Sequence, residues 1–266
     1  MQRIGFIGIG SQGGPMAMRI VDAGMPLVVW ARRPEALEPY LAKGASAAAS
    51  VADLGARCDH VGVCVVDDAG VLAICDELIP AMRPGACLAL HSTVLPATVE
   101  ELERRCTARG IAFVDAPVSG GAPGAEAGTL TVMCGGTQAA FDSAHEVFET
   151  FGKLIVLLGP AGAGQRAKIV NNALLAANMG LAQAALQAGE TLGVDRAALA
   201  ALVKESSGRS FGFEVFARLP SPAAFAIGAP LLVKDVGLLG AILPGHDGAD
   251  LLAHAAHPFL TAATGG

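Results

Sequence analysis

The chain has 266 residues, enough for one large domain or two modest ones that each bury a core. Apolar residues make up 53% of the sequence and charged residues 16%, which is typical of folded globular proteins and argues against disorder. The net charge of −6 argues against nucleic acid as a partner, because phosphate binding needs a basic surface. The sequence shows neither a signal peptide nor an apolar run that could span a membrane, so we expect a cytoplasmic protein with no membrane partner.

The first part of the chain alternates between short apolar runs and longer amphipathic segments. Strands are predicted at 3–9, 27–30, 60–66, 87–91, 111–114, 130–134 and 154–158. Helices are predicted between them at 15–23, 35–43, 71–82, 97–109 and 141–151. Strands that alternate with helices through short connections form parallel sheets, so we predict an N-terminal Rossmann-type, doubly wound α/β domain.

After Gly159 and Pro160 the strand pattern ends. Helices are predicted at 165–192, 196–203 and 232–242. The first of these is nearly uncharged between Ile169 and Ala188, and a helix that is apolar on most faces is buried in a core or against another subunit. We therefore predict an all-α C-terminal domain, with domains at 1–161 and 162–266, and a homodimer or dimer-based oligomer.

The six cysteines are spread along the chain without a C-x-x-C pair. They are Cys58, Cys64, Cys75, Cys87, Cys106 and Cys134. Several lie in apolar strand-like runs, which favours buried and reduced thiols over disulfides. We expect no metal site.

A glycine-rich loop, G-I-G-S-Q-G, joins the first predicted strand to the first predicted helix. In such a loop Gly8 permits the tight turn, Gly10 lets a pyrophosphate approach the backbone, and Gly13 allows close helix–strand packing. The helix N-terminus offers N–H groups and positive potential to phosphate oxygens. An ordinary glycine-rich turn is the alternative, but this context predicts a dinucleotide site that also includes Ser11 and Gln12.

Two arginines, Arg32 and Arg33, follow the second strand. Enzymes that prefer NAD place an Asp or Glu near here, about 20 residues beyond the glycines, to bind the ribose 2′-hydroxyl. A guanidinium instead pairs with a 2′-phosphate and stacks on adenine. We therefore predict that NADP(H) is preferred and that NAD(H) is possible. The alternative is that both arginines are solvated loop charges.

Four motifs, in order along nearly the whole chain, resemble those of the β-hydroxyacid dehydrogenase family. They are residues 8–18, D-A-P-V-S-G-G at 115–121, G-A-G-Q-R-A-K-I-V-N-N at 162–172, and K-D at 234–235. The resemblance implies reversible hydride transfer between a nicotinamide cofactor and a small 3-hydroxy acid or its semialdehyde. It also implies a small carboxylate-bearing substrate as the partner.

Ser119, Gly120 and Gly121 follow a strand and bring a hydroxyl group and backbone N–H groups into one turn. Such a turn is a nest for a carboxylate, and in the family the equivalent turn binds the substrate carboxylate. The alternative is a plain Gly-Gly turn with a solvated serine.

Lys168 and Asn172 are four residues apart on a predicted helix, so both point the same way. The surrounding helix is apolar, and a desolvated lysine has a lowered pKa that suits proton transfer near neutral pH. The resemblance implies that Lys168 is the general acid/base and that Asn172 orients the substrate. The alternative for Lys168 is a surface charge.

The resemblance also extends the cofactor site. It implies contacts from Thr93, from Val65 and Val66 where the family commonly has Leu-Pro, and from Lys234, which would close over the cofactor. On local grounds Thr93 is equally suited to cap the helix entered at Pro96. Asp235 is expected to have an anchoring or capping role.

Some features depart from the family or fit other enzymes. Gln12 replaces the usual Met of the glycine loop, and the region after Asp235 is short, so we expect a terminal helix to be missing or altered. We read His91 and the other histidines as structural. An imine reductase-like enzyme would carry another residue at Lys168, and 6-phosphogluconate-type decarboxylation needs a larger helical domain. A catalytically inactive regulatory protein should have lost both Lys168 and the carboxylate turn.

Overall fold

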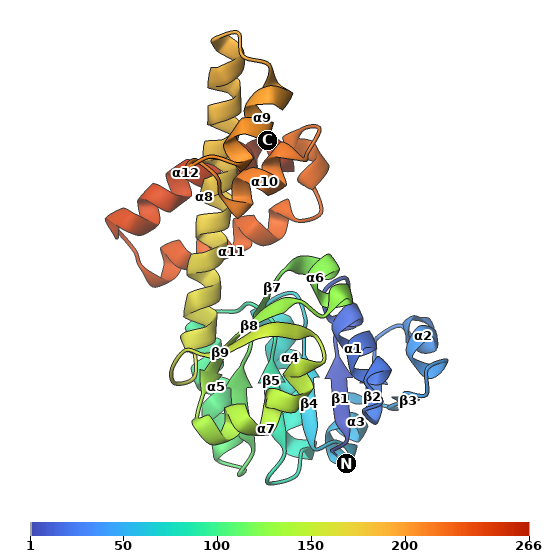
Figure 1. Cartoon of the computed structure of the whole chain (residues 1–266). Coiled ribbons are helices and arrows are strands. Elements are labelled where there is room, and N and C mark those ends of the chain that lie inside the picture. Colours follow the sequence, from blue (N-terminus) through green and yellow to red (C-terminus); the bar gives the residue numbers. More distant parts are fainter. Residues whose placement is uncertain (1, 266) are drawn as a thin grey trace. The chain divides into compact units, whose positions relative to one another are not determined.

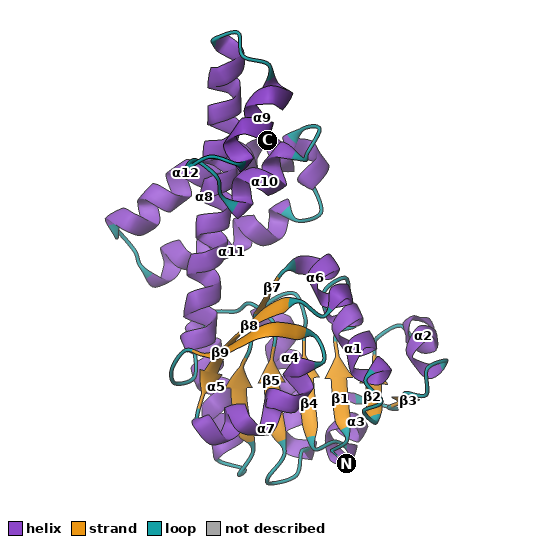
Figure 2. Cartoon of the chain, viewed as in Figure 1, coloured by secondary structure: helices purple, strands orange, loops and turns teal. Residues whose placement is uncertain are grey.

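The computed structural model describes residues 2–265, which form two compact units that divide between Lys168 and Ile169. Among the described residues, all strands lie in the first unit and the second contains only helices (Figure 2). This arrangement confirms the predicted Rossmann-type sheet followed by an all-α domain. We call the first the Rossmann unit and the second the helical unit. The prediction placed the domain boundary at 161/162, whereas the units divide between Lys168 and Ile169.

The Rossmann unit holds a nine-stranded sheet and the helices that cover it (Figure 1). The strands are β1 Ile4–Ile7, β2 Leu27–Trp30, β3 Ser46–Ala47, β4 His60–Val63, β5 Cys87–Leu90, β6 Ala112–Asp115, β7 Val118–Ser119, β8 Leu130–Gly136 and β9 Gly152–Leu157. The helices are α1 Gly13–Asp22, α2 Glu38–Leu41, α3 Val51–Arg57, α4 Asp68–Ala81, α5 Pro96–Thr107, α6 Gly121–Ala127 and α7 Gln138–Glu149.

The strand order is β3-β2-β1-β4-β5-β6-β8-β7, with β9 paired to β8. The strands from β3 to β6 are parallel, and β8 is antiparallel to β6 and β7. The order reverses between β1 and β4, where Ile7 pairs with Val63. Ligands of doubly wound sheets bind beyond the strand ends at such a switch point, so the topology brings the glycine loop to the expected place.

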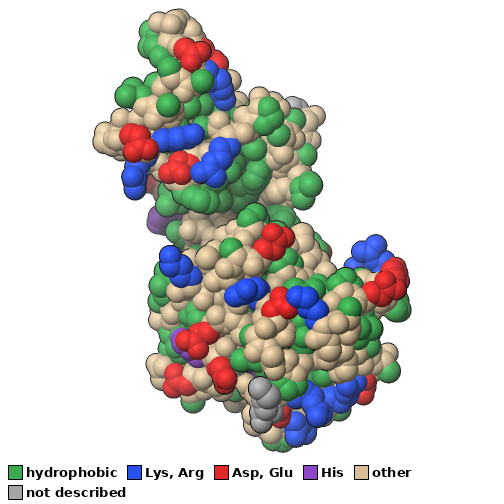
Figure 3. Space-filling view, turned by 45° about the vertical axis from the view of Figure 1, so that its right-hand side comes forward, with side chains coloured by type: hydrophobic (Ala, Val, Ile, Leu, Met, Phe, Trp, Pro, Cys, Tyr) green, Lys and Arg blue, Asp and Glu red, His purple; other side chains and the backbone are tan. Residues whose placement is uncertain are grey.

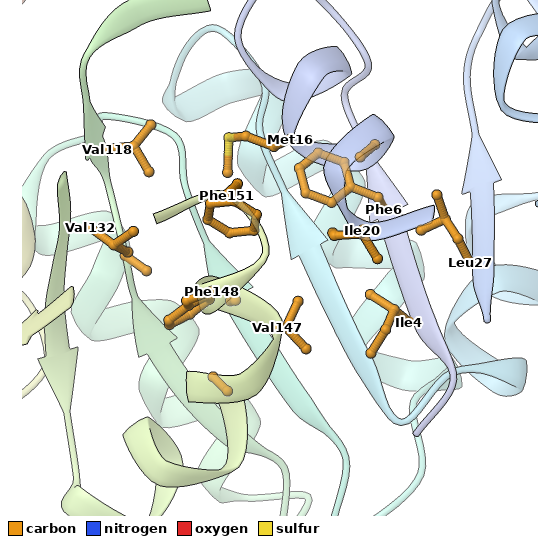
Figure 4. Close-up of a cluster of buried hydrophobic side chains, with 14 of the residues drawn as sticks. Ile4, Phe6, Met16, Ile20, Leu27, Val118, Val132, Val147, Phe148 and Phe151 are labelled. Carbon is orange, nitrogen blue, oxygen red and sulfur yellow. The ribbon is translucent and has the colours of Figure 1, made fainter. Parts of the chain in front are cut away.

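The sheet is buried on both faces, as parallel sheets require. Side chains of α1 and α7 pack on one face and those of α3, α4 and α5 on the other. Figure 4 shows the first of these cores, where Phe6 of β1, Met16 of α1 and Phe148 of α7 converge. Because apolar residues alternate between two covered faces, the central strands β1, β2, β4 and β5 appear in the sequence as continuous apolar runs.

The helical unit is built along one long helix. Its helices are α8 Ala163–Thr191, which begins in the Rossmann unit, α9 Arg196–Lys204, α10 Phe211–Ala217, α11 Ala229–Ile242 and α12 Asp247–Thr264. A Cβ at Gly180 of α8 would lie 1.8 Å from the Ala255 carbonyl oxygen, so α12 packs backbone against backbone on α8. Helix α12 thus ends the described chain, and the expectation that a terminal helix of the family is missing or altered stays a prediction.

Helix α8 is long and apolar enough to cross a membrane by length and composition alone. Half of its most apolar stretch is buried inside the fold. All six cysteines are free, and five of them are buried, which confirms the prediction of reduced thiols.

Candidate active site

The glycine loop combines two tightly packed glycines with an open one. Gly8 has a φ of 96°, and a Cβ there would lie 2.0 Å from the Cys64 carbonyl oxygen. A Cβ at Gly13 would lie 2.1 Å from the Gly8 carbonyl oxygen. At Gly10, by contrast, a Cβ would meet no described atom within 4 Å. The chain therefore needs Gly8 and Gly13 for its own packing, whereas Gly10 leaves the backbone accessible to a ligand.

The start of α1 suits an anion. Ser11 is exposed, and Gln12 occupies the N-cap position without a capping hydrogen bond from its side chain. Within the described residues, the first turn of this helix carries no acidic side chain. A helix N-terminus without a carboxylate offers its N–H groups and positive potential to phosphate oxygens. The loop and this turn therefore fit the pyrophosphate of a dinucleotide.

The neighbouring strand ends carry the other expected cofactor residues. Arg32 and Arg33 are exposed just beyond β2, where a guanidinium can meet a ribose phosphate. Beyond β4, Val65 is half-buried and Val66 is 68% exposed. The backbone N–H of Val65 donates to the hydroxyl of Ser92 over 2.8 Å, which ties the loop after β4 to the loop after β5.

Thr93 lies in that loop after β5 and is partly exposed. Helix α5 has Leu95 at its N-cap, so the structure does not support the reading of Thr93 as the cap of this helix. The neighbours of Thr93 are fixed instead by Gln165 of α8. Its side-chain oxygen accepts from the Val94 N–H at 3.1 Å, and its side-chain nitrogen donates to the Ser92 carbonyl at 2.7 Å.

A buried carboxylate at the end of β6 fixes the start of α8. The oxygens of Asp115 accept from the backbone N–H groups of Gly162 at 2.7 Å and Gln165 at 2.8 Å. Burial raises the pKa of Asp115 to about 6, although both N–H groups act to lower it. Lys168 lies on the same helix and is buried. Sequence reasoning missed the roles of Asp115 and Gln165, although an Asp at the end of an apolar strand was a usable signal.

The predicted carboxylate turn is built on two glycines in backbone conformations that other residues rarely adopt. Ser119 ends β7 opposite Thr131 of β8, and the next two glycines have φ values of 130° and 63°. Gly120 and Gly121 are exposed, and the chain then enters α6. A Cβ at Gly120 would approach the Leu130 side chain to 2.9 Å. Ser119 and this exposed backbone therefore lie in one turn, and their role in carboxylate binding stays a prediction.

In the helical unit, Asn172 of α8 is held by Asp235 of α11. The Asn172 side-chain nitrogen donates to one Asp235 oxygen over 2.5 Å, and the other oxygen lies 3.4 Å from the Lys234 ammonium. Asn171 donates to the side-chain oxygen of Asn172 over 3.2 Å. Because a carboxylate only accepts hydrogen bonds, Asp235 fixes which way the Asn172 amide faces. The anchoring role expected for Asp235 stays a prediction, and this contact supports it.

The buried histidines stand in the core. The His91 ring stacks on Phe6, with centroids 5.9 Å apart and planes at 12°, and its Nδ1 lies 2.8 Å from the Ala116 carbonyl oxygen. Burial lowers the pKa of His91 to about 4 despite that carbonyl, and it lowers the pKa of His60 to about 3, with His91 acting in the same direction. Both are therefore neutral at physiological pH and act as packing groups.

Two family profiles match the chain in succession. The profile described as the NAD binding domain of 6-phosphogluconate dehydrogenase matches residues 3–159. The profile described as NAD-binding of NADP-dependent 3-hydroxyisobutyrate dehydrogenase matches residues 162–265.

Individual relatives match over most of the chain. The NAD-dependent L-serine dehydrogenase of Pseudomonas aeruginosa is 37% identical over 257 residues, covering 90% of this chain and 84% of the relative. The mitochondrial 3-hydroxyisobutyrate dehydrogenase of Drosophila melanogaster is 34% identical over 251 residues, covering 91% and 78%. A solved structure of Mycobacterium tuberculosis 3-hydroxyisobutyrate dehydrogenase with L-serine superposes with a TM-score of 0.83 at 28% identity, covering 97% and 92%.

Proposed function

Because the chain belongs to the β-hydroxyacid dehydrogenase family and is an NAD(P)-dependent hydroxyacid dehydrogenase, we propose that it interconverts a small 3-hydroxy acid and its semialdehyde or keto acid with a preference for NADP(H). The observation that carries the proposal is that the Rossmann unit contains both an accessible glycine loop backbone at Gly10 and a buried lysine, Lys168. The first suits a dinucleotide and the second suits proton transfer.

Each group has a separate task in this reaction. The Ser119 hydroxyl and the backbone of Gly120 and Gly121 bind the substrate carboxylate, which leaves the 3-hydroxyl as the reacting end. Asn172, with its amide turned by Asp235, orients that end. Lys168 takes the hydroxyl proton during oxidation and returns it during reduction. The nicotinamide, when bound, accepts or supplies the hydride. Positioning and acid–base catalysis together provide the rate enhancement.

Lys168→Ala tests the acid–base assignment. Loss of a positioned acid–base group should lower kcat by about 10²–10⁴. Lys153→Ala is the matched control, because Lys153 is an exposed lysine of β9 in the same unit. Circular dichroism shows whether both variants are folded. A folded Lys168→Ala variant with unchanged kcat would exclude the role.

The cofactor preference is tested by comparing kcat/KM for NADPH and NADH. Arg32 is exposed at the end of β2, so Arg32→Ala should raise KM for NADPH and leave KM for NADH nearly unchanged. One relative is named an NAD-dependent enzyme. A wild-type preference for NADH would therefore refute the NADP(H) assignment while leaving the dehydrogenase assignment intact.

The substrate class is tested with a small panel. Oxidation is measured with 3-hydroxyisobutyrate and L-serine, and reduction with glyoxylate, succinic semialdehyde and tartronate semialdehyde. A cyclic imine is included because the imine reductase-like alternative would reduce it. Activity on the imine alone would overturn the proposal, and NADPH binding with no turnover of any compound would favour an inactive regulatory protein.

We also propose that the enzyme is a homodimer or a dimer-based oligomer. Apolar side chains reach the surface of the helical unit, where they are green in Figure 3. Val170, Leu174 and Leu181 are 47%, 49% and 57% exposed along one side of α8, an arrangement that a second copy can cover. Light scattering should give at least twice the chain mass, and a monomer would contradict the proposal.

A further inference from the structure

The side chain of Gln165 pairs with the backbone on both sides of Thr93. It is fully buried, and its carbonyl oxygen and amide nitrogen make hydrogen bonds in opposite directions, to the Val94 N–H and the Ser92 carbonyl. The Ser92 carbonyl directly precedes Thr93 and the Val94 N–H directly follows it in the backbone. One side-chain amide therefore fixes the peptide plane on each side of this residue.

The backbone of the same residue is held as firmly as its side chain. Gln165 donates its N–H to Asp115, whose second oxygen accepts from Gly162. The approach is close because Gly164 has no side chain, since a Cβ there would lie 2.2 Å from the Met133 carbonyl oxygen and 2.8 Å from Asp115. The first turn of α8 thus rests on the sheet without room for any larger residue at position 164.

The position of the first turn of α8 determines where Lys168 lies. Gln165 and Lys168 are three residues apart on α8, so their side chains leave the same side of the helix. A helix turns about 100° and rises about 1.5 Å per residue, so a small rotation of its first turn moves the next one with it. The bonds of Gln165 to Ser92 and Val94 oppose such a rotation.

We propose that Gln165 is a positioning residue that holds Lys168 in register with the Thr93 loop, so that one buried amide sets the distance between the proton-transfer group and the cofactor-contacting loop. The inference rests on the proposed roles of Lys168 and Thr93. It extends to the loop after β4, because the hydroxyl of Ser92 accepts from the Val65 N–H. The loops after β4 and β5 are thereby linked to the first turn of α8 through Gln165.

Two variants of Gln165 separate positioning from folding. Gln165→Met keeps the length of the side chain but removes both hydrogen bonds, so kcat should fall about 10–100-fold at every pH, because a displacement of about 1 Å costs a factor of this order. KM for the carboxylate substrate should stay within about threefold, since the turn at Ser119 is not part of the network.

Gln165→Glu provides a rescue by pH. The ionised carboxyl group faces the Ser92 carbonyl with no proton to donate, whereas the protonated form restores the donor. The ratio of variant to wild-type kcat should therefore rise at least about fivefold between about pH 8 and about pH 6, since burial raises the pKa of a carboxyl group. Asp115 and the exposed Arg166, which pairs with Glu100 at 3.6 Å, are present in both proteins, so the ratio removes their titration.

The matched control is Gln187→Glu, which makes the same change at an exposed position of α8 and should leave kcat and its pH profile unchanged. All variants are checked by circular dichroism at each pH, and if Gln165→Met does not fold, Gln165→Glu alone decides. Wild-type kcat in folded Gln165→Glu at both pH values, with Lys168→Ala inactive, would overturn the inference and leave the proposed function standing. Full activity of Lys168→Ala would refute the proposed function and, with it, the role of Gln165 in placing that lysine.

Discussion

Acidification should destabilise this protein through two buried histidines. Burial lowers the pKa of His60 to about 3, and His91 adds to the effect, while burial lowers the pKa of His91 itself to about 4. In the unfolded chain both groups return to about 6.5. The unfolded state therefore binds protons that the folded state refuses, so the stability contributed by neutral histidine is present above about pH 6.5 and is lost as the pH falls below it.

The magnitude follows from the distance below that pKa. At about pH 5 each histidine is about 1.5 units below its unfolded pKa, and at about 1.4 kcal/mol per unit each costs about 2 kcal/mol. Asp115 acts in the opposite direction. Its pKa is raised to about 6 by burial, so the folded state takes up its proton first and gains stability as the pH falls. That gain is about 1 kcal/mol by about pH 5, which leaves a net loss of about 3 kcal/mol.

Urea unfolding at about pH 7.5 and about pH 5 measures this loss, and His60→Leu isolates one contribution. Neither ring nitrogen of His60 has a hydrogen-bond partner among the described residues, so an apolar side chain of similar size should be neutral or stabilising at the higher pH. The variant should lose about 2 kcal/mol less on acidification than the wild type. His257→Leu, at an exposed position of α12, is the control. An identical pH dependence in His60→Leu and wild type would refute the reasoning.

Three further outcomes follow from the same structure. Gly8→Ala should lower the free energy of unfolding by several kcal/mol or prevent folding, because the added Cβ would overlap the Cys64 carbonyl. Gly10→Ala should keep wild-type stability in urea but raise the Kd for NADPH, measured by cofactor fluorescence, at least about tenfold. Equal stability of the two variants would contradict this. Asp115→Asn should lower the free energy of unfolding by about 1–3 kcal/mol, because an amide offers only one acceptor to two N–H groups, and an unchanged urea midpoint would count against it. Native protein should react slowly with thiol reagents at about pH 8, because burial raises the pKa of Cys87 to about 11 and of the other five thiols to about 12. Rapid labelling of the folded protein would contradict this.

Seven of the nine strands of the Rossmann unit were predicted, because a strand buried on both faces carries an unbroken apolar run. The two missed strands, β3 and β7, have only two residues each. The helices missed by prediction, α3, α6, α10 and α12, are short or weakly marked. Helix α6 contains two glycines and a proline within seven residues, and it forms where α1 packs against it. Helix α12 begins at Asp247 and has His246 at its N-cap, a residue that rarely signals a helix start. In both, tertiary packing overrides a weak local preference.

The residues of the candidate site also fall into those that local sequence predicted and those that depend on distant contacts. Gly8, Gly10 and Gly13 were assigned from local spacing, and the structure gives each a distinct packing environment. Nothing in the sequence indicated the role of Gln165, because its hydrogen-bond partners lie 71 and 73 residues away in the chain. Asp115 reaches over 47 and 50 residues. No periodicity encodes such pairs, so only the folded structure shows which backbone groups these side chains hold.

We infer from the burial of Asp115 that a fixed position for the first turn of α8 matters more in this protein than the folding free energy that the buried charge costs. An ionised carboxylate whose pKa is raised to about 6 costs the folded state about 3 kcal/mol at neutral pH relative to an exposed one. An apolar residue would avoid that cost but would leave two buried N–H groups without an acceptor. A carboxylate accepts from Gly162 and Gln165 at once and also complements the positive end of the helix. The unfavourable charge is thus retained at the turn that precedes Lys168, where a displaced helix start would move the group proposed to transfer the proton.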